Sequence, residues 1–373
     1  MVSYKAIMNS SLKDKPGRAL MSTFSTFRHA STASPPFKLK MECSSICNLK
    51  CKMCPLNTGL KRKQGFLKFK NFKYVFDQIR PAYLNLTGIG EPFLNPDLFR
   101  IIKYARSKKA MVKLDTNGTL LNEKNIKRIL NTKIDIISTS IDGANKKSYE
   151  KIRIGSDFEL VKKNVKNLVK ERNKTNSRSE IHMFFVLQED NIRDLPDFIR
   201  LAEELGVDYM AGSFVVSLGK NENKKNKIFG YKGNLKELIE KTKKLVKESK
   251  IEISIGPLLE YLEYEGEKEF YNEKTPCYMP WYSTFITWDG YVNPCDFSCD
   301  NEISFGNVFK EPFKNIWNNE KYKKFRLKVL KNRDKINLCR GCGVNESYLK
   351  KEIDKIKKIP FAKFLQYNPD EKK

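Results

Sequence analysis

Three cysteines, Cys47, Cys51 and Cys54, stand in one short stretch with the spacing CxxxCxxC. Three thiolates can hold a four-iron cluster and leave one iron without a protein ligand, whereas four-cysteine ferredoxin patterns occupy every iron and only carry electrons. An iron with an open position has room for a substrate or cofactor, as a catalytic zinc site does. The spacing therefore predicts an iron–sulfur cluster that takes part in chemistry.

A second group of cysteines lies near the other end of the chain and consists of Cys277, Cys295, Cys339 and Cys342. The first two flank a predicted hairpin, and the last two form a CxxC pair. Two such distant pairs, brought together, make a four-ligand site. A structural zinc held by four thiolates is one interpretation. Because a cluster motif precedes the group, an auxiliary four-iron cluster is the favoured interpretation.

Two further cysteines complete the total of nine. Cys43 lies on the strand before the triplet and is predicted to be a buried core thiol. Cys299, four residues after Cys295, is predicted to bind no metal, with replacement of one cluster ligand as the alternative. Clustered CxxC-type spacings favour metal binding in a reducing compartment, so we expect a cytoplasmic protein.

Composition limits the class of protein. The 373 residues, 40% of them hydrophobic, suffice for a substantial core in one large or two moderate domains. No stretch approaches the roughly 18 apolar residues that span a bilayer, so we expect a soluble protein. The net charge of +27 comes mostly from lysines scattered along predicted helix faces, which makes nucleic acid an unlikely partner. A basic surface equally suits an acidic electron donor such as flavodoxin or ferredoxin.

Strands and helices are predicted to alternate from Phe37 onward. The expected strands are residues 37–45, 83–89, 111–115, 134–141, 181–187 and 208–216, and the expected helices are 71–80, 95–108, 157–171 and 195–205. About six β-α units with buried strands predict an α/β fold with a parallel sheet. Periodicity does not separate an open sheet from a partial barrel, but in both the functional groups collect where the strands end.

Polar or glycine-rich motifs follow five of these strands. They are the cysteine triplet and residues 88–91, 116–118, 140–143 and 187–188. Because the carboxyl ends of parallel strands meet at one edge, these motifs should converge. In the C-terminal region, strands 283–288 and 291–293 flank Asp289-Gly290, a hairpin signal.

The motifs together resemble those of radical S-adenosylmethionine (SAM) enzymes with a C-terminal SPASM or twitch domain, over roughly residues 37–345. The resemblance implies a partial (β/α)6 TIM-like barrel with a small cysteine-rich SPASM/twitch domain. It implies SAM and two [4Fe-4S] clusters as cofactors, the first cluster held by the three-cysteine motif and the second an auxiliary cluster. In such enzymes the amino and carboxylate groups of SAM chelate the open iron. Reductive cleavage then gives a 5′-deoxyadenosyl radical that abstracts a substrate hydrogen.

The resemblance extends to the SAM contacts. Met53 occupies the position beside the adenine. Residues 87–92 resemble the GGE motif, with Gly88, Gly90 and Glu91 placed to bind the SAM ammonium and Ile89 between the glycines.

Four further residues complete the expected SAM site. Ser140 and Arg153 resemble the contacts to the ribose hydroxyls and the carboxylate, a surface arginine being the alternative for Arg153. Asn117 either faces the ligand or stabilises its turn. Leu187 either borders the adenine or packs in the core.

The domain boundaries follow from these motifs. We predict a basic N-terminal arm (1–36), a radical SAM partial-barrel core (37–217), a charged segment completing the core (218–270), a SPASM/twitch domain (271–346) and a lysine-rich tail (347–373). With 36 residues before the core, no separate leader-peptide domain is expected there.

The expected function is that of a radical SAM oxidoreductase or maturase whose auxiliary cluster assists electron transfer. The nearest carboxylates to the auxiliary cysteines that could take a proton are Asp296 and Asp289, the latter also a typical turn residue. The small number of residues before the core favours a small, carbohydrate-like substrate. Peptide or protein maturation, RNA modification and a non-enzymatic electron-transfer role are the alternatives.

Overall fold

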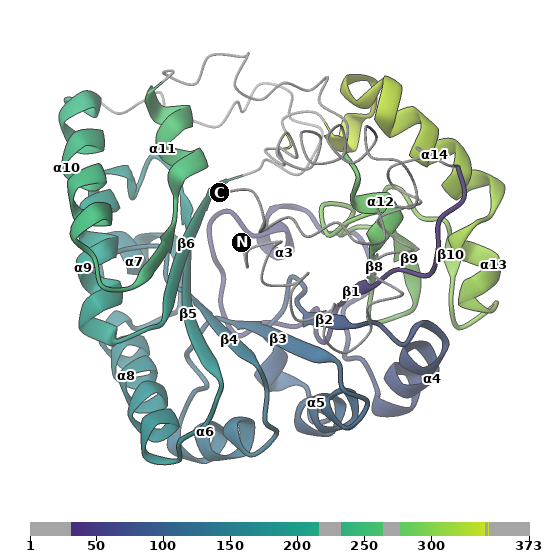
Figure 1. Cartoon of the computed structure of the whole chain (residues 1–373), viewed down its shortest axis with the longest axis horizontal. Coiled ribbons are helices and arrows are strands. Elements are labelled where there is room, and N and C mark those ends of the chain that lie inside the picture. The colour runs from purple at the N-terminus through teal and green to yellow at the C-terminus, as the bar shows by residue number, and fades with distance from the viewer. Residues whose placement is uncertain (1–30, 216–232, 264–276, 340–341, 343–373) are drawn as a thin grey trace, which may run out of the picture.

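The computed structural model describes residues 31–215, 233–263, 277–339 and 342. Within them a single sheet of ten strands has the order β10-β9-β8-β1-β2-β3-β4-β5-β6-β7. It curves so that helices cover its convex side (Figure 1). The core strands, each parallel to its neighbours, are β1 (Lys38–Met41), β2 (Tyr83–Leu86), β3 (Met111–Thr116), β4 (Ile136–Ser140), β5 (Glu180–Leu187) and β6 (Tyr209–Phe214).

The six predicted core strands are all present, and the α/β partial-barrel prediction is confirmed. Strands β1 and β2 end well before the expected residue, at Met41 and Leu86. In both cases the residues beyond the strand form the loops that carry the cysteine triplet and residues 88–91. A short strand that was not predicted, β7 (Glu252–Ser254), adds to β6 in parallel. It lies within the predicted charged segment 218–270.

Helices follow most of the core strands. The longer ones are α4 (Phe69–Ile79), α5 (Leu98–Ser107), α6 (Glu123–Leu130), α7 (Lys146–Ile152), α8 (Phe158–Lys174), α9 (Leu195–Leu205), α10 (Leu235–Glu248) and α11 (Gly256–Glu263). The start of α8 is as expected, because the Asp157 side chain accepts a hydrogen bond from Leu160 N at 3.0 Å. The predicted bounds of α9 match, whereas α6 and α7 were not predicted.

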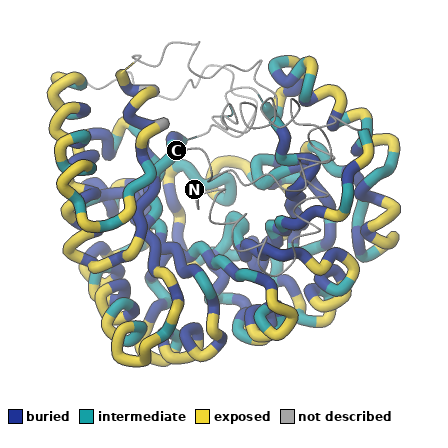
Figure 2. Tube along the Cα trace, viewed as in Figure 1, coloured by how far each residue is buried: buried dark blue, intermediate teal, exposed yellow. Residues whose placement is uncertain are grey.

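The two faces of the sheet differ in chemistry. On β3 the side chains of Val112 and Leu114 are fully buried against the helices, and the intervening residues are half-buried on the concave side. On β5 the helix-facing Phe185 stacks on Phe198 of α9 with ring centroids 4.2 Å apart. Figure 2 shows buried strands inside and exposed residues on the outer faces of the helices. The apolar core therefore lies between sheet and helices, and the concave side is left for polar groups.

The C-terminal region extends the same sheet. Strand β8 (Ser283–Ile286) pairs in parallel with β1, and β9 (Tyr291–Asn293) and β10 (Gly306–Asn307) follow as antiparallel neighbours. The predicted hairpin turn is present, with Gly290 at φ 93°. The division into a core and a domain at 271–346 remains a prediction, and the sheet is continuous across it.

The remaining elements are α3 (Pro55–Thr58), η1 (Pro92–Leu94), η2 (Ile192–Asp194), α12 (Met279–Tyr282), α13 (Phe313–Trp317), α14 (Glu320–Lys331), η3 (Arg333–Lys335) and η4 (Asn337–Cys339). The predicted N-terminal arm is described only from residue 31, where Ala33 N donates to Asn318 Oδ1 at 2.9 Å. The predicted tail 347–373 lies outside the described residues. Among the described helices, none combines the length and apolar character needed to cross a bilayer.

Candidate active site

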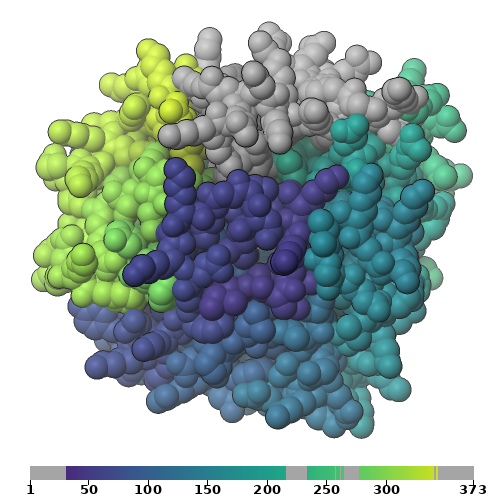
Figure 3. All heavy atoms as spheres, turned by 180° about the vertical axis from the view of Figure 1, so that it is seen from behind, coloured from purple at the N-terminus to yellow at the C-terminus, as the bar shows by residue number. Residues whose placement is uncertain are grey.

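The cysteine loop, residues 42–54, joins β1 to α3. Its backbone is fixed to the segment that carries Arg153, because Lys50 N donates to Ile154 O and Lys52 N donates to Ile152 O, both at 2.9 Å. The thiols of Cys47, Cys51 and Cys54 are close enough to interact electrostatically with one another. Figure 3 shows the beginning of the described chain, in purple and blue, at the surface between the C-terminal region and the later core. The three predicted cluster ligands are therefore gathered on one loop.

The chemistry of this loop fits a cluster. Burial raises the pKa of Cys47 and Cys51, and it raises the pKa of Cys54 to about 11. The nearby Arg153 guanidinium acts in the opposite direction on all three pKa values. Because metal ligands must be thiolates, cluster loading has to displace these protons. Three soft donors on one loop beside a cation are a suitable ligand set for a [4Fe-4S] cluster.

The glycine motif, residues 88–91, packs directly on the cysteine loop. Gly90 N donates to Ser44 O at 3.1 Å, and Glu91 N donates to Ile46 O at 2.9 Å. A Cβ atom on Gly90 would lie 2.6 Å from each of these carbonyl oxygens. A Cβ on Gly88 would lie 2.5 Å from Glu42 Cγ. Only glycine allows this approach, so the motif and the cysteine loop form one unit.

Glu91 is buried, and its carboxylate accepts hydrogen bonds from three groups of the protein. Its Oε1 accepts from Thr116 Oγ1 at 2.8 Å and from Phe93 N at 3.1 Å, and its Oε2 accepts from Asn117 N at 2.8 Å. Burial raises its pKa, against the effect of these hydrogen bonds. Since a carboxylate oxygen can accept two hydrogen bonds, Oε2 keeps one acceptor position with respect to the described residues. That position suits an ammonium group.

Of the two alternatives for Asn117, the structure shows the turn-stabilising one, and contact with the ligand stays a prediction. Asn117 Oδ1 accepts from Thr119 N at 2.9 Å, which stabilises the turn after β3. Its Nδ2 donates to Asn48 Oδ1 at 2.9 Å and lies 3.8 Å from Cys47 Sγ. The side chain therefore links the turn to the cysteine loop.

Arg153 is not a surface arginine, and that alternative is wrong. Its Nε and Nη2 each donate to Asp142 Oδ2 at 2.8 Å, and the two side chains are 9% and 0% exposed. Asp142 Oδ1 in turn accepts from Val186 N at 2.7 Å. The sequence places Asp142 in the polar motif 140–143 but gives no signal that it is the partner of Arg153. The pair holds a guanidinium beside the three cysteines, where a carboxylate ligand could meet it.

The other three residues expected to contact SAM differ in how deeply they are buried. Met53 is half-buried within the cysteine loop, and Ser140 lies half-buried at the end of β4. Leu187 is fully buried in the same hydrophobic core as Met183 and Phe185. Its environment is therefore that of the core-packing alternative.

A group of polar residues lines the concave side of β1, β2 and β3, next to the cysteine loop. Register places Lys40, Asn85 and Lys113 side by side across the three strands. Lys113 Nζ lies 2.8 Å from Asp115 Oδ1, and Thr87 donates to Asp115. We call Lys40, Asn85, Thr87, Lys113 and Asp115 the concave-face polar set.

Asp296, which follows Cys295, reaches this set from the C-terminal region. Lys40 Nζ lies 2.6 Å from Asp296 Oδ2, with side chains 15% and 33% exposed. Burial works to raise the pKa of Asp296, but the Lys40 ammonium more than offsets it and holds the pKa below its usual range. Asp289 instead accepts from Thr287 Oγ1 at 2.6 Å within the hairpin, so it is a turn residue.

The four predicted auxiliary ligands are far apart in the sequence, and the structure brings three of them, Cys295, Cys339 and Cys342, within electrostatic range of one another. Cys295 interacts electrostatically with Cys339 and Cys342, and the Arg333 guanidinium interacts with Cys277, Cys339 and Cys342. Burial raises the pKa of Cys339 to about 11 and also raises that of Cys295. Four soft thiols with an adjacent cation fit an iron–sulfur cluster.

The remaining two cysteines are both buried. Cys43 is fully buried, and Asn95 Nδ2 donates to its Sγ at 3.2 Å. Cys299 is also buried and has Glu302, Arg62 and Glu42 as its charged neighbours. Cys43 is therefore a buried core thiol, as the sequence predicted, whereas the absence of a metal on Cys299 stays a prediction.

Comparison with known families gives two matches. Residues 41–202 match the radical SAM superfamily, and residues 277–343 match SPASM, an iron–sulfur cluster-binding domain. These ranges contain all seven cysteines that were predicted to bind clusters.

Three characterised relatives align with the chain. The tungsten-containing aldehyde ferredoxin oxidoreductase cofactor-modifying protein of Pyrococcus furiosus is 28% identical over 78% of this chain and 83% of its own length. The AdoMet-dependent heme synthase of Methanosarcina barkeri is 26% identical over 83% and 88%. The mycofactocin maturase MftC of Mycobacterium tuberculosis is 28% identical over 46% and 43%.

Solved structures support the fold. SuiB of Streptococcus suis, bound to its precursor peptide SuiA, superposes with a TM-score of 0.64 at 16% identity, over 87% of this chain and 73% of SuiB. At this identity the likeness concerns the fold alone. The chain belongs to the radical SAM superfamily and is an enzyme that uses S-adenosylmethionine and [4Fe-4S] clusters, with a C-terminal SPASM iron–sulfur domain.

Proposed function

We propose that this enzyme is an oxidoreductase or maturase whose substrate is a small, carbohydrate-like molecule held on the concave-face polar set. When bound, SAM and the first cluster would supply the radical, and the auxiliary cluster would supply an acceptor for one electron. The reaction breaks a substrate C–H bond and forms a C–H bond in 5′-deoxyadenosine. The substrate radical then loses one proton and one electron to give a neutral oxidised product.

The proposed roles of the chain's own residues follow from their contacts. The free acceptor position of Glu91 Oε2 would take the SAM ammonium, and the Arg153 guanidinium, held by Asp142, would take the SAM carboxylate. Gly88 and Gly90 allow the backbone to approach the ligand. Asn117 would hold the turn against the cysteine loop.

The concave-face polar set is the observation that carries the choice of substrate. Lys40, Lys113 and Asp115 are half-buried charged groups, of which Lys40 interacts electrostatically with Cys295, and Asn85 and Thr87 add amide and hydroxyl groups. Sugar hydroxyls both donate and accept hydrogen bonds, so a surface of alternating donors and acceptors suits them. A flat apolar ring would require apolar or aromatic side chains at these positions.

The test compares substrate classes on the anaerobically reconstituted enzyme. A panel of monosaccharides and aminocyclitols and a panel of synthetic peptides are each added with SAM and dithionite, and 5′-deoxyadenosine is measured. We expect stimulation by a member of the first panel. Asp115→Asn should reduce it about tenfold or more, because a charge-assisted hydrogen bond is lost. The control Lys127→Met removes an exposed lysine of α6 and should change nothing.

Peptide or protein maturation is the second candidate. It is supported by similarity to a protein named as a maturase, MftC, over part of the chain. In the same assay, stimulation by peptides alone would replace the carbohydrate proposal with this one. If dithionite and SAM gave no 5′-deoxyadenosine with any addition, the proposed reaction itself would be wrong.

We further propose an acidic flavodoxin or ferredoxin as electron donor. The chain carries 71 Lys and Arg against 44 Asp and Glu. Opposite net charges accelerate association, and the acceleration falls as salt screens them. The rate of cluster reduction by a flavodoxin should therefore decrease steeply between low and physiological salt. For RNA, the remaining alternative, a steep salt dependence of RNA binding would be required.

A further inference from the structure

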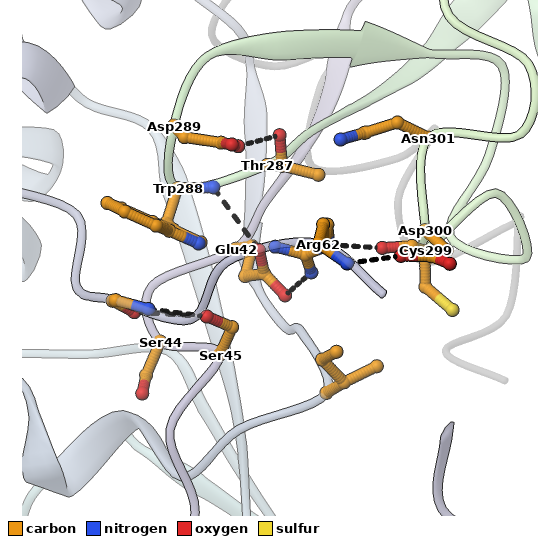
Figure 4. Close-up of polar contacts among 12 residues, drawn as sticks. Glu42, Ser44, Ser45, Arg62, Thr287, Trp288, Asp289, Cys299, Asp300 and Asn301 are labelled. Atoms are coloured by element: carbon orange, nitrogen blue, oxygen red, sulfur yellow. Dashed lines mark hydrogen bonds and ion pairs between the residues drawn. The ribbon is translucent and has the colours of Figure 1, made fainter. Parts of the chain in front are cut away.

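A buried ion pair links the cysteine loop to the segment that follows it. Glu42 stands just after β1 and is fully buried, and Arg62, in the loop after α3, has a side chain only 6% exposed. Glu42 Oε1 lies 2.6 Å from Arg62 Nη2. Removing two charges from water is costly, so such a pair persists only where further hydrogen bonds hold it. Figure 4 shows the pair and its neighbours.

Glu42 contacts two other parts of the molecule. Its Oε2 accepts from the backbone N–H of Trp288, in the hairpin of the SPASM domain, at 3.2 Å. The backbone N–H of Ile89, inside the glycine motif, also interacts with the carboxylate. The absence of a side chain on Gly88 lets Glu42 reach this place. One carboxylate therefore joins the glycine motif to the SPASM hairpin.

Arg62 adds a second link to the SPASM domain. Its Nε donates to Cys299 O, in the segment that follows Cys295. The backbone N–H groups of Lys61 and Arg62 donate to Asp300 Oδ1 at 3.0 and 2.8 Å. The loop after the cysteine triplet is thus attached to the same segment that carries an auxiliary ligand.

Packing reinforces these polar links. A Cβ on Gly65 would lie 2.5 Å from the Trp288 ring, so the loop passes directly over the indole. Trp288 Nε1 donates to Lys63 O at 3.4 Å. Gly65 N donates to Ser45 Oγ at 2.8 Å, which ties this loop back to the cysteine loop. Glu42 and Arg62 therefore each contact both the first cluster region and the SPASM region.

We propose that Glu42 and Arg62 are positioning residues that couple SAM binding at the glycine motif to the placement of the SPASM hairpin. SAM that orders residues 88–91 fixes Ile89 against Glu42, and Glu42 then holds the Trp288 N–H. The coupling is reciprocal, because a contact that stabilises the hairpin must also favour SAM. The inference rests on the proposed roles of Glu91 and Arg153 in SAM binding.

Hydrogen exchange of the Trp288 amide tests the coupling without turnover. The reconstituted enzyme is held anaerobically without reductant, and exchange in the peptide containing Trp288 is measured with and without SAM. In the wild type, SAM should slow this exchange by about fivefold or more, the usual lower range of coupling between sites. In Glu42→Gln and Arg62→Met the slowing should disappear.

Controls separate positioning from loss of fold. Arg62→Lys keeps the positive charge but loses the planar guanidinium. Part of the SAM-induced slowing of exchange at Trp288 should therefore remain in this variant. Arg106→Met removes a partly exposed ion pair with Asp135, remote from both loops, and should leave the effect intact. Exchange in β5 should be the same in every variant.

The outcomes distinguish this inference from the proposed function. Equal SAM-induced slowing at Trp288 in the wild type and in both Glu42→Gln and Arg62→Met would overturn the coupling, even if SAM is cleaved normally. Failure of the wild type to bind SAM, seen as an unchanged cluster spectrum, would instead overturn the SAM site on which the inference rests. Slowing that is lost in Arg106→Met as well would also refute a specific role of the pair.

Discussion

The two cysteine regions of this enzyme are built in opposite ways. Cys47, Cys51 and Cys54 share one loop, which is fixed by backbone hydrogen bonds to neighbouring segments. The four SPASM cysteines come from residues 277 to 342, and Cys295 approaches Cys339 and Cys342 only because the hairpin, α14 and the turns after it pack together. One ligand set is made by local chain geometry and the other by tertiary packing.

Because of this difference, the two sets of cysteines should respond differently to substitutions elsewhere in the protein. A local loop can keep its ligands close when distant parts of the protein are disturbed. A site assembled from distant segments depends on every contact between them. Each region also holds one buried arginine beside its thiols, Arg153 in the first and Arg333 in the second. Substitutions matched between the regions can therefore test the comparison.

The largest expected difference is between Cys54→Ala and Cys339→Ala. Loss of one of three ligands should abolish SAM cleavage, whereas loss of an auxiliary ligand should leave at least uncoupled cleavage. The assay is 5′-deoxyadenosine formed with dithionite, alongside the iron content of each variant. Cys43→Ala, which removes a core thiol, is the control and should keep its full iron content. Equal loss of SAM cleavage in both variants would contradict separate roles for the two cysteine regions.

Arg153→Met should have the next largest effect. The substitution leaves Asp142 buried without its partner and removes the proposed contact to the SAM carboxylate. The free energy of SAM binding should become less favourable by about 2–5 kcal/mol. The SAM concentration needed to perturb the cluster spectrum should rise at least tenfold. Arg333→Met should not change that concentration but should alter the auxiliary cluster signal. If Arg333→Met changed the SAM affinity and Arg153→Met did not, the assignment of Arg153 to the SAM site would be wrong.

Two glycine substitutions extend the test to the backbone. Gly90→Ala places Cβ 2.6 Å from two carbonyl oxygens of the cysteine loop and should lower SAM cleavage. Gly290→Ala, at φ 93°, strains the SPASM hairpin and should spare cleavage. Each substitution should lower the free energy of unfolding by about 1–3 kcal/mol. Gly256→Ala, where a Cβ meets nothing within 4 Å, is the matched control. The comparison fails if Gly290→Ala lowers cleavage as much as Gly90→Ala does.

The smallest expected effect belongs to a residue that serves neither cluster. Asp157→Ala removes the side chain that caps α8, which should cost about 1 kcal/mol of stability. The melting temperature should fall by roughly 2 °C, and the SAM affinity should stay the same. A marked change in SAM affinity here would show that the site responds to general destabilisation, which would weaken the other three tests.

What could be predicted from the sequence follows the same division. The cysteine triplet, residues 88–91 and the alternation of strands and helices are local patterns, and the structure places them where strand ends meet. The Asp142–Arg153 fork, the Lys40–Asp296 pair and the Glu42–Arg62 pair join residues from different elements. No local spacing records which of many charged residues will meet. The parallel register of β1 with β8 likewise has no short-range signal.

That register has a consequence for synthesis of the chain. Strand β1 carries the cysteine loop and is hydrogen-bonded on one side by β2 and on the other by β8. Because β8 is made last among these strands, a growing chain exposes one edge of β1 until residues 283–286 have emerged. An open edge strand invites pairing with another chain, so this interval is a period of aggregation risk. A pairing between such distant segments is also expected to form late in folding. The strand that leads into the catalytic loop is therefore completed only when the SPASM region arrives.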